Sequence, residues 1–88
     1  MYIFTWKLIN DIAYNGPHWK AILLNKEMQT SLYTLAQITP NGNNYHWYIY
    51  LTSESGNALS LETAKLDCNE PLSEYGYIQC SDKMLSFL

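Results

Sequence analysis

The chain contains no arginine, and charged residues of all kinds make up only 15% of its 88 residues. Soluble domains usually carry about 25%. Because bidentate contacts to guanine are most often made by arginine, its absence argues against a sequence-specific reader of nucleic acid. The acidic isoelectric point, near 5.1, argues in the same direction against binding to the phosphate backbone.

The sequence also lacks long apolar runs and has little cysteine. No stretch approaches the roughly 18 apolar residues that cross a bilayer, and the start of the chain has no basic region before its apolar stretch, as a signal peptide would. Cys68 and Cys80 have no partners at metal-ligand spacing. We therefore predict two reduced thiols in a cytoplasmic protein of the host cell, with no membrane association.

Residues that carry catalysis are equally scarce. The only histidines are His18 and His46, and the four glycines are scattered, so no phosphate-cradling loop is present. No serine stands in a nucleophile elbow, and no histidine, cysteine and carboxylate cluster has metal spacing. An enzyme would need the two histidines to converge with a carboxylate. We predict a protein that is not an enzyme and uses no cofactor or metal.

Aromatic residues are abundant by contrast: eight tyrosines, three tryptophans and two phenylalanines. Hydrophobic residues reach 48%. Disordered chains are poor in aromatics and rich in charge, so this chain is predicted to fold. We expect a single domain over residues 1–88, because the length leaves room for one core only.

Alternation of apolar and polar residues predicts strands over residues 2–9, 18–25, 32–39 and 45–51. Turn residues follow the first strand at Asn15-Gly16-Pro17 and precede the fourth over 39–44, where they predict a hairpin. In the third strand, Leu35 is expected on the face opposite Ala36. In the fourth, Tyr48 and Tyr50 are expected on the face opposite Trp47.

The period changes after residue 58. Ser60 is a good helix N-cap, and a stripe at 3-4-4 spacing follows it, made of Leu61, Ala64, Cys68 and Leu72. Pro71 predicts that the regular helix stops near Glu70. A short edge strand over 75–80 is possible, and the apolar segment 84–88 is expected to dock on the core or a partner. The fold class predicted is α+β, an antiparallel four- to five-stranded sheet with one helix packed on one face.

Charge divides unevenly along the chain. Residues 1–51 carry three lysines against two acids, for +1, and residues 52–88 carry two lysines against six acids, for −4. The acids of the helix region are either a solvated surface or a patch that meets a basic partner. The candidate partner-binding residues are the acids Glu62, Asp67, Glu70 and Glu74, with Tyr48 and Tyr50 as aromatic anchors.

The aromatic surface leaves alternatives open. Both sheet faces are covered, or exposed tyrosines bind a protein, or they stack the bases of single-stranded nucleic acid. A further alternative is a structural homo-oligomer, such as a homodimer, assembled through exposed sheet edges.

Three segments resemble small phage and prophage proteins: Trp47-Tyr48-Ile49-Tyr50-Leu51, Gly56-Asn57-Ala58, and Ser60-Leu61-Glu62-Thr63-Ala64-Lys65. The resemblance covers about two-thirds of the chain, including Trp6-Lys7 and Trp19-Lys20-Ala21, and departs at Asn69-Glu70-Pro71. It implies a viral anti-defence protein of the anti-CRISPR type. Such an inhibitor binds a functional surface of a host protein or nucleoprotein complex.

Overall fold

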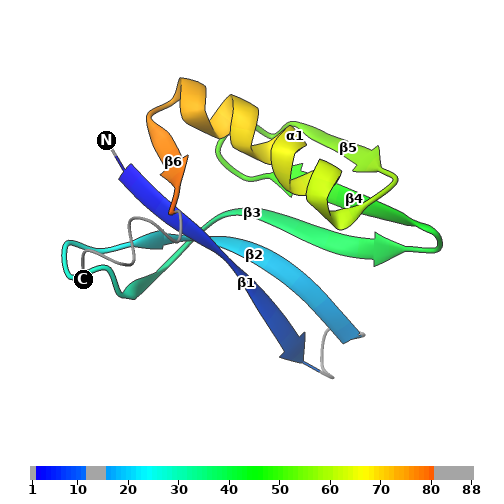
Figure 1. Ribbon diagram of the computed structural model, residues 1–88, viewed down its shortest axis with the longest axis horizontal. Coiled ribbons are helices and arrows are strands. Elements are labelled where there is room, and N and C mark those ends of the chain that lie inside the picture. Colours follow the sequence, from blue (N-terminus) through cyan, green and yellow to red (C-terminus); the bar gives the residue numbers. More distant parts are fainter. Residues whose placement is uncertain (1, 12–15, 81–88) are drawn as a thin grey trace.

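The computed structural model describes residues 2–11 and 16–80. Its order is five strands, one helix and a last short strand (Figure 1). The strands are β1 (Tyr2–Asp11), β2 (Gly16–Leu24), β3 (Thr30–Asn41), β4 (Asn44–Ile49), β5 (Ser55–Ala58) and β6 (Tyr77–Gln79), and the helix is α1 (Leu61–Glu74).

All six strands form one sheet in the order β5-β4-β3-β2-β1-β6. The first five pair antiparallel with their chain neighbours, whereas β6 runs parallel to β1 at the far edge. The helix joins the two edge strands, and the sheet curls around it (Figure 1). The predicted α+β class is confirmed. The predicted count and pairing are not, because the sheet has six strands and is mixed.

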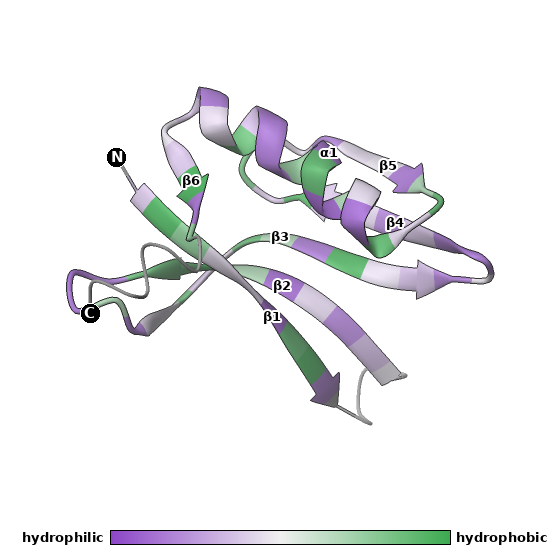
Figure 2. Ribbon diagram, in the orientation of Figure 1, coloured by the Kyte–Doolittle hydropathy of each residue, from purple (hydrophilic) through white to green (hydrophobic). Residues whose placement is uncertain are grey.

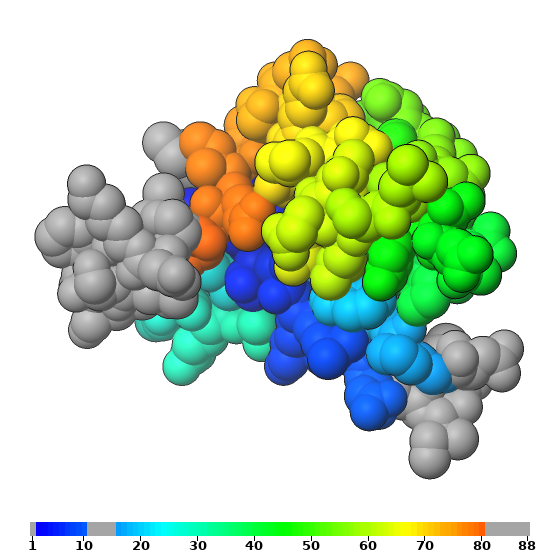
Figure 3. All heavy atoms as spheres, turned by 45° about the vertical axis from the view of Figure 1, so that its right-hand side comes forward, coloured from blue at the N-terminus to red at the C-terminus, as the bar shows by residue number. Residues whose placement is uncertain are grey.

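The core lies between the helix and the inner face of the sheet. Phe4, Ile38 and Ile49 are fully buried there, and the helix contributes Ala64, Cys68 and Leu72. Hydrophobic and hydrophilic residues alternate along α1 (Figure 2), because one side of the helix packs on the sheet and the other side is exposed to solvent. The predicted helix stripe is thus confirmed, and the space-filling view shows α1 covering this face (Figure 3).

Strand β3 departs from simple alternation at Leu35. Ala21 pairs with Ala36, but the next residue, Ile22, pairs with Thr34, so Leu35 is an extra residue on β3. Such a bulge disturbs the two-residue period. Leu35 is therefore buried together with Ala36, and the prediction that they lie on opposite faces was wrong.

The helix runs through Pro71 to Glu74, so the prediction that it ends near Glu70 was wrong. A proline inside a helix removes the hydrogen bond from its own nitrogen, here the one to the Asp67 carbonyl, and its ring crowds that carbonyl, at a cost of about 3 kcal/mol. Leu72 is fully buried directly after it and holds the last turn on the core. The helix start is as predicted, because the Ser60 hydroxyl accepts from the Thr63 N–H at 3.1 Å.

The remaining predictions fall at the sheet edges and the chain ends. Strand β5 was not predicted, since Ser55-Gly56-Asn57-Ala58 has no apolar alternation. The possible edge strand over 75–80 is confirmed as β6. The predicted turn at Asn15 and docking of residues 84–88 lie outside the described residues. Within the described part, no helix has the length and apolarity needed to cross a membrane.

Candidate functional site

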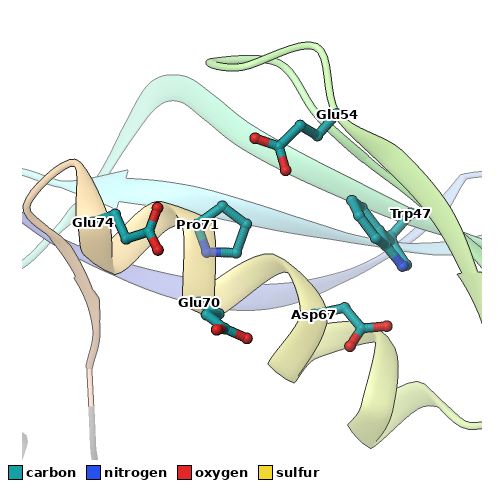
Figure 4. A pocket seen from close by; sticks show the side chains of 6 residues that line it. All are labelled: Trp47, Glu54, Asp67, Glu70, Pro71 and Glu74. Carbon is teal, nitrogen blue, oxygen red and sulfur yellow. The ribbon is translucent and has the colours of Figure 1, made fainter.

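An acidic groove separates α1 from the turn that joins β4 to β5 (Figure 4). It is an open hollow of about 480 Å³. We use the name acidic groove for the six residues that line it: Trp47, Glu54, Asp67, Glu70, Pro71 and Glu74. Four of the six are carboxylates.

Helical spacing supplies one wall of the acidic groove. Asp67, Glu70, Pro71 and Glu74 follow one another at intervals of three, one and three residues, which places them on one side of α1. These positions lie beside the buried stripe, so their side chains emerge at the boundary between helix and sheet.

The β4–β5 turn supplies the other wall. The Ile49 N–H donates to the Glu54 carbonyl and the Ser53 N–H to the Ile49 carbonyl, both at 2.8 Å. The Thr52 hydroxyl accepts from the Glu54 N–H at 3.3 Å. Because its own backbone is held twice, Glu54 stays on the rim facing the helix (Figure 4).

The four carboxylates of the acidic groove are not neutralised. Within residues 2–11 and 16–80, no lysine or histidine forms an ion pair with any of them. Glu74 is the last residue of α1 and lies at the negative end of the helix dipole. The last turn has no basic residue that would offset this unfavourable position. Like charges at helical spacings of three and four cost about 0.2–0.5 kcal/mol per pair. The acidic groove therefore reduces the stability of the folded chain.

Trp47 forms the apolar end of the acidic groove. Its indole lies over Gly56 of the neighbouring strand, and a Cβ at that position would meet indole Cζ2 at 2.6 Å. The indole Nε1 is buried and has no hydrogen-bond partner. An unsatisfied buried donor costs about 1–3 kcal/mol, so this end of the groove is also not optimised for stability.

The structure brings together three of the four acids predicted from sequence. Asp67, Glu70 and Glu74 line the acidic groove, whereas Glu62 lies in the first turn of α1, away from it. Glu54 and Trp47 were missed. Glu54 could not be placed beside the helix without β5. Trp47 was expected on the face opposite Tyr48 and Tyr50, but no sequence pattern indicated that it lies beside the helical acids.

Tyr48 and Tyr50 lie on the opposite face of the sheet. Inner-face Trp47 and Ile49 alternate with them, and the Tyr50 hydroxyl donates to Gln37 Oε1 at 2.9 Å. The two tyrosines and the acidic groove therefore lie on opposite sides of the sheet. A single flat partner surface cannot contact both.

The described residues include no cluster of metal ligands, and the two histidines lie on different strands. No group of three or more His, Cys, Asp or Glu side chains there could hold a metal ion. His18 and His46 lie on one sheet face with β3 between their strands, so about 10 Å separates their backbones.

Cys68 and Cys80 are not joined in a disulfide. Burial raises the pKa of the Cys68 thiol to about 12, and the neighbouring Asp67 carboxylate adds to the effect. Cys68 thus stays protonated at neutral pH and is a packing residue rather than a nucleophile.

Comparison with protein-family models, with curated proteins and with solved structures finds no match for this chain.

Proposed function

We propose that the chain is a non-catalytic interaction protein that binds a basic surface of a partner through the acidic groove. The observation that carries the proposal is the set of four carboxylates without ion pairs, gathered from a helix and a facing turn. They lower the stability of the free chain, and a basic partner would relieve their repulsion. Departures from stable packing and pairing are expected at functional sites.

The partner class follows from charge complementarity. Extended basic surfaces are typical of proteins that bind nucleic acid. An acidic protein that covers such a surface competes with nucleic acid for it. We therefore propose inhibition of a host defence nucleoprotein, the function that the resemblance to small phage proteins also implies.

A first experiment measures binding to a lysine- and arginine-rich 12-residue peptide by fluorescence anisotropy at increasing salt. We expect affinity to fall steeply with salt, because screening acts on exposed charges. The double variant Glu70→Gln, Glu74→Gln should lose about tenfold or more in affinity. The matched control Glu27→Gln, Glu62→Gln removes the same charge away from the groove and should bind nearly as the wild type does. Equal losses in both variants would overturn the groove as the site.

A second experiment tests the partner class. The tagged chain is used to recover partners from host lysate with and without nuclease. We expect a stoichiometric protein that remains after nuclease, fails to bind the Glu70→Gln, Glu74→Gln variant, and loses its own nucleic-acid binding when the wild-type chain is added. A partner that still binds nucleic acid in the presence of the wild-type chain would contradict inhibition.

A further inference from the structure

Strand β5 forms one edge of the sheet, and among the described residues only β4 pairs with it (Figure 1). Across this pairing, the Ile49 N–H donates to the Glu54 carbonyl. The N–H and C=O groups of successive strand residues point to alternate sides, so those of Gly56 also face β4. The N–H and C=O groups of Ser55 and Asn57 therefore point away from the sheet.

This edge of β5 is open to a further strand. Ser55 and Asn57 are exposed, and neither forms a backbone hydrogen bond across the edge with another described residue. Natural edges are often protected by lysine, proline or a bulge. The four residues of β5 include no lysine or proline, and their register on β4 is continuous. An extended segment could therefore pair with β5 over about 13 Å.

The acidic groove lies beside the same edge. Glu54 directly precedes β5, and Asp67, Glu70 and Glu74 lie across the groove from it, on α1 (Figure 4). The three helical acids extend over about 10 Å along the helix axis. In an extended segment, side chains on one face follow each other at about 7 Å. A strand added to β5 can therefore direct two successive side chains of one face toward these carboxylates.

Gly56 leaves room for those side chains. The Trp47 indole occupies the space that a side chain at position 56 would fill, because a Cβ there would lie 2.6 Å from indole Cζ2. A residue opposite Gly56 on an added strand would therefore have the indole as its neighbour on the helix side. The stem of a lysine is apolar and can pack against such a ring while its ammonium group reaches polar surroundings. This position suits a long basic side chain.

Charge determines which kind of strand the edge accepts. Pairing of β5 with β5 of a second copy would bring two acidic grooves together, on chains that each carry a net charge of −3. Like charges repel, whereas a basic segment would neutralise the carboxylates. The acidic groove therefore disfavours self-association through β5 and favours a basic strand.

We propose that the partner binds by strand addition: an extended segment of the partner pairs antiparallel with the free edge of β5 and directs every second side chain, lysine or arginine, into the acidic groove. Backbone hydrogen bonds to Ser55 and Asn57 supply the pairing, and the carboxylates select the basic side chains. Antiparallel pairing is slightly more stable per residue than parallel pairing. The proposal rests on the proposed function, because it names the form in which the basic surface is presented.

The test uses a fluorescein-labelled peptide of nine residues that alternates lysine and threonine, with lysine at both ends, and the full chain. With the lysines in the groove, antiparallel pairing places threonines opposite Ser55 and Asn57, so the threonine N–H groups point to β5 and the lysine N–H groups point away. Methylation of the threonine nitrogens should weaken binding, read as anisotropy, by about tenfold or more, because donors at the edge are lost. Methylation of the lysine nitrogens is the matched control and should leave the affinity unchanged.

Amide hydrogen exchange followed by NMR gives a second readout that needs no variant. The Ser55 and Asn57 N–H groups should exchange about tenfold more slowly, or slower still, when the unmethylated peptide is bound. The other edge of the sheet supplies the internal control. On β6 the N–H groups of Tyr77 and Gln79 point away from β1, since the next residue, Cys80, donates to β1. Their exchange should not change.

The outcomes separate this proposal from the proposed function. Equal binding of all three alternating peptides, with a loss in the variant Glu70→Gln, Glu74→Gln, would overturn strand addition and leave the acidic groove as the site. Equal losses on both methylations, or slower exchange on β6 as well as β5, would also overturn strand addition. Binding of the 12-residue basic peptide but not of the alternating peptide would do the same. If neither peptide binds at low salt, both proposals fail.

Discussion

Trp6 on β1 and Asn69 on α1 are joined by a hydrogen bond, in which the indole Nε1 donates to Asn69 Oδ1 at 3.0 Å. The other side of the same amide, Asn69 Nδ2, donates to Gln79 Oε1 on β6 at 2.5 Å. One helical side chain therefore holds the first and last strands of the sheet against α1. Among the described residues, Asn69 is the one side chain of α1 that is hydrogen-bonded to β1 or β6, so it fixes the position of the helix at this edge.

Substitution Asn69→Ala should lower the free energy of unfolding by about 1–3 kcal/mol, because the half-buried indole N–H loses its acceptor. Urea denaturation followed by circular dichroism measures the change. Asn57→Ala, at an exposed position on β5, is the control and should cost much less. Equal effects of the two substitutions would show that the Trp6–Asn69 bond adds no net stability.

Gly56→Ala should destabilise the fold by about 1–3 kcal/mol, since the new methyl group would meet the Trp47 indole. A double-mutant cycle with Trp47→Leu isolates this contact. Once the indole is gone, the cost of Gly56→Ala should largely disappear. If the cost stays the same in the Trp47→Leu background, the backbone of β5 rather than the indole requires glycine.

Pro71→Ala should raise the free energy of unfolding by about 1–2 kcal/mol. The new N–H can bond the Asp67 carbonyl, and alanine favours a helix by about 3 kcal/mol over proline, less the entropy that proline removes from the unfolded chain. Thermal and urea unfolding measure the change. A decrease in stability would mean that packing of the proline ring in the acidic groove outweighs the missing bond.

Glu70→Gln should also stabilise the chain at pH 7, by about 0.3–1 kcal/mol, because it removes like-charge repulsion with Asp67 and Glu74. Glu62→Gln should act in the opposite direction, because Glu62 lies in the first turn, where the helix dipole favours an anion. Both variants remove one negative charge, so an effect of net charge alone would change the free energy of unfolding in the same direction in both. Changes of opposite sign would show that the local surroundings of each residue decide the effect. Equal signs would contradict the repulsion inferred in the groove.

The stability of the chain should fall in alkaline solution because of Cys68. Its pKa is about 12 in the folded chain and near 9.0 when exposed. The raised value means that its contribution is complete below about pH 9 and is lost as pH rises toward 12, with a slope of at most about 1.4 kcal/mol per pH unit. Urea unfolding from about pH 8 to pH 11 should show a shallower decline for Cys68→Ala than for the wild type. If the free energy of unfolding falls with pH equally in Cys68→Ala and in the wild type, other titrating groups cause the decline.

Local sequence patterns predicted those strands and the helix whose own residues show the period of a strand or of a helix. Alternation located β1 to β4, and Ser60 with the apolar stripe located α1. Alternation did not reveal the bulge at Leu35, because the position of an extra residue in β3 depends on how β3 pairs with β2. Pro71 was misread because the buried contact of Leu72 outweighs the local penalty of proline.

The candidate site was predicted to a lesser extent, since grooves depend on elements that meet only in three dimensions. Three helical acids share a side by spacing alone, and those were found. Glu54 and Trp47 join them only through β5, whose four residues carry no strand signal. The placement of Tyr48 and Tyr50 on the face opposite Trp47 followed from alternation.

The pairing of β6 with β1 also governs how the chain assembles. Tyr2 lies beside Tyr77, with rings stacked at 5.2 Å, so the contact joins residues from nearly opposite ends of the described chain. Contacts of such long sequence separation slow folding, because the loop must close before they form. During synthesis the edge of β1 stays unpaired until α1 and β6 have emerged. An unpaired edge is open to pairing with other strands, so this late closure is the step at which folding and aggregation compete.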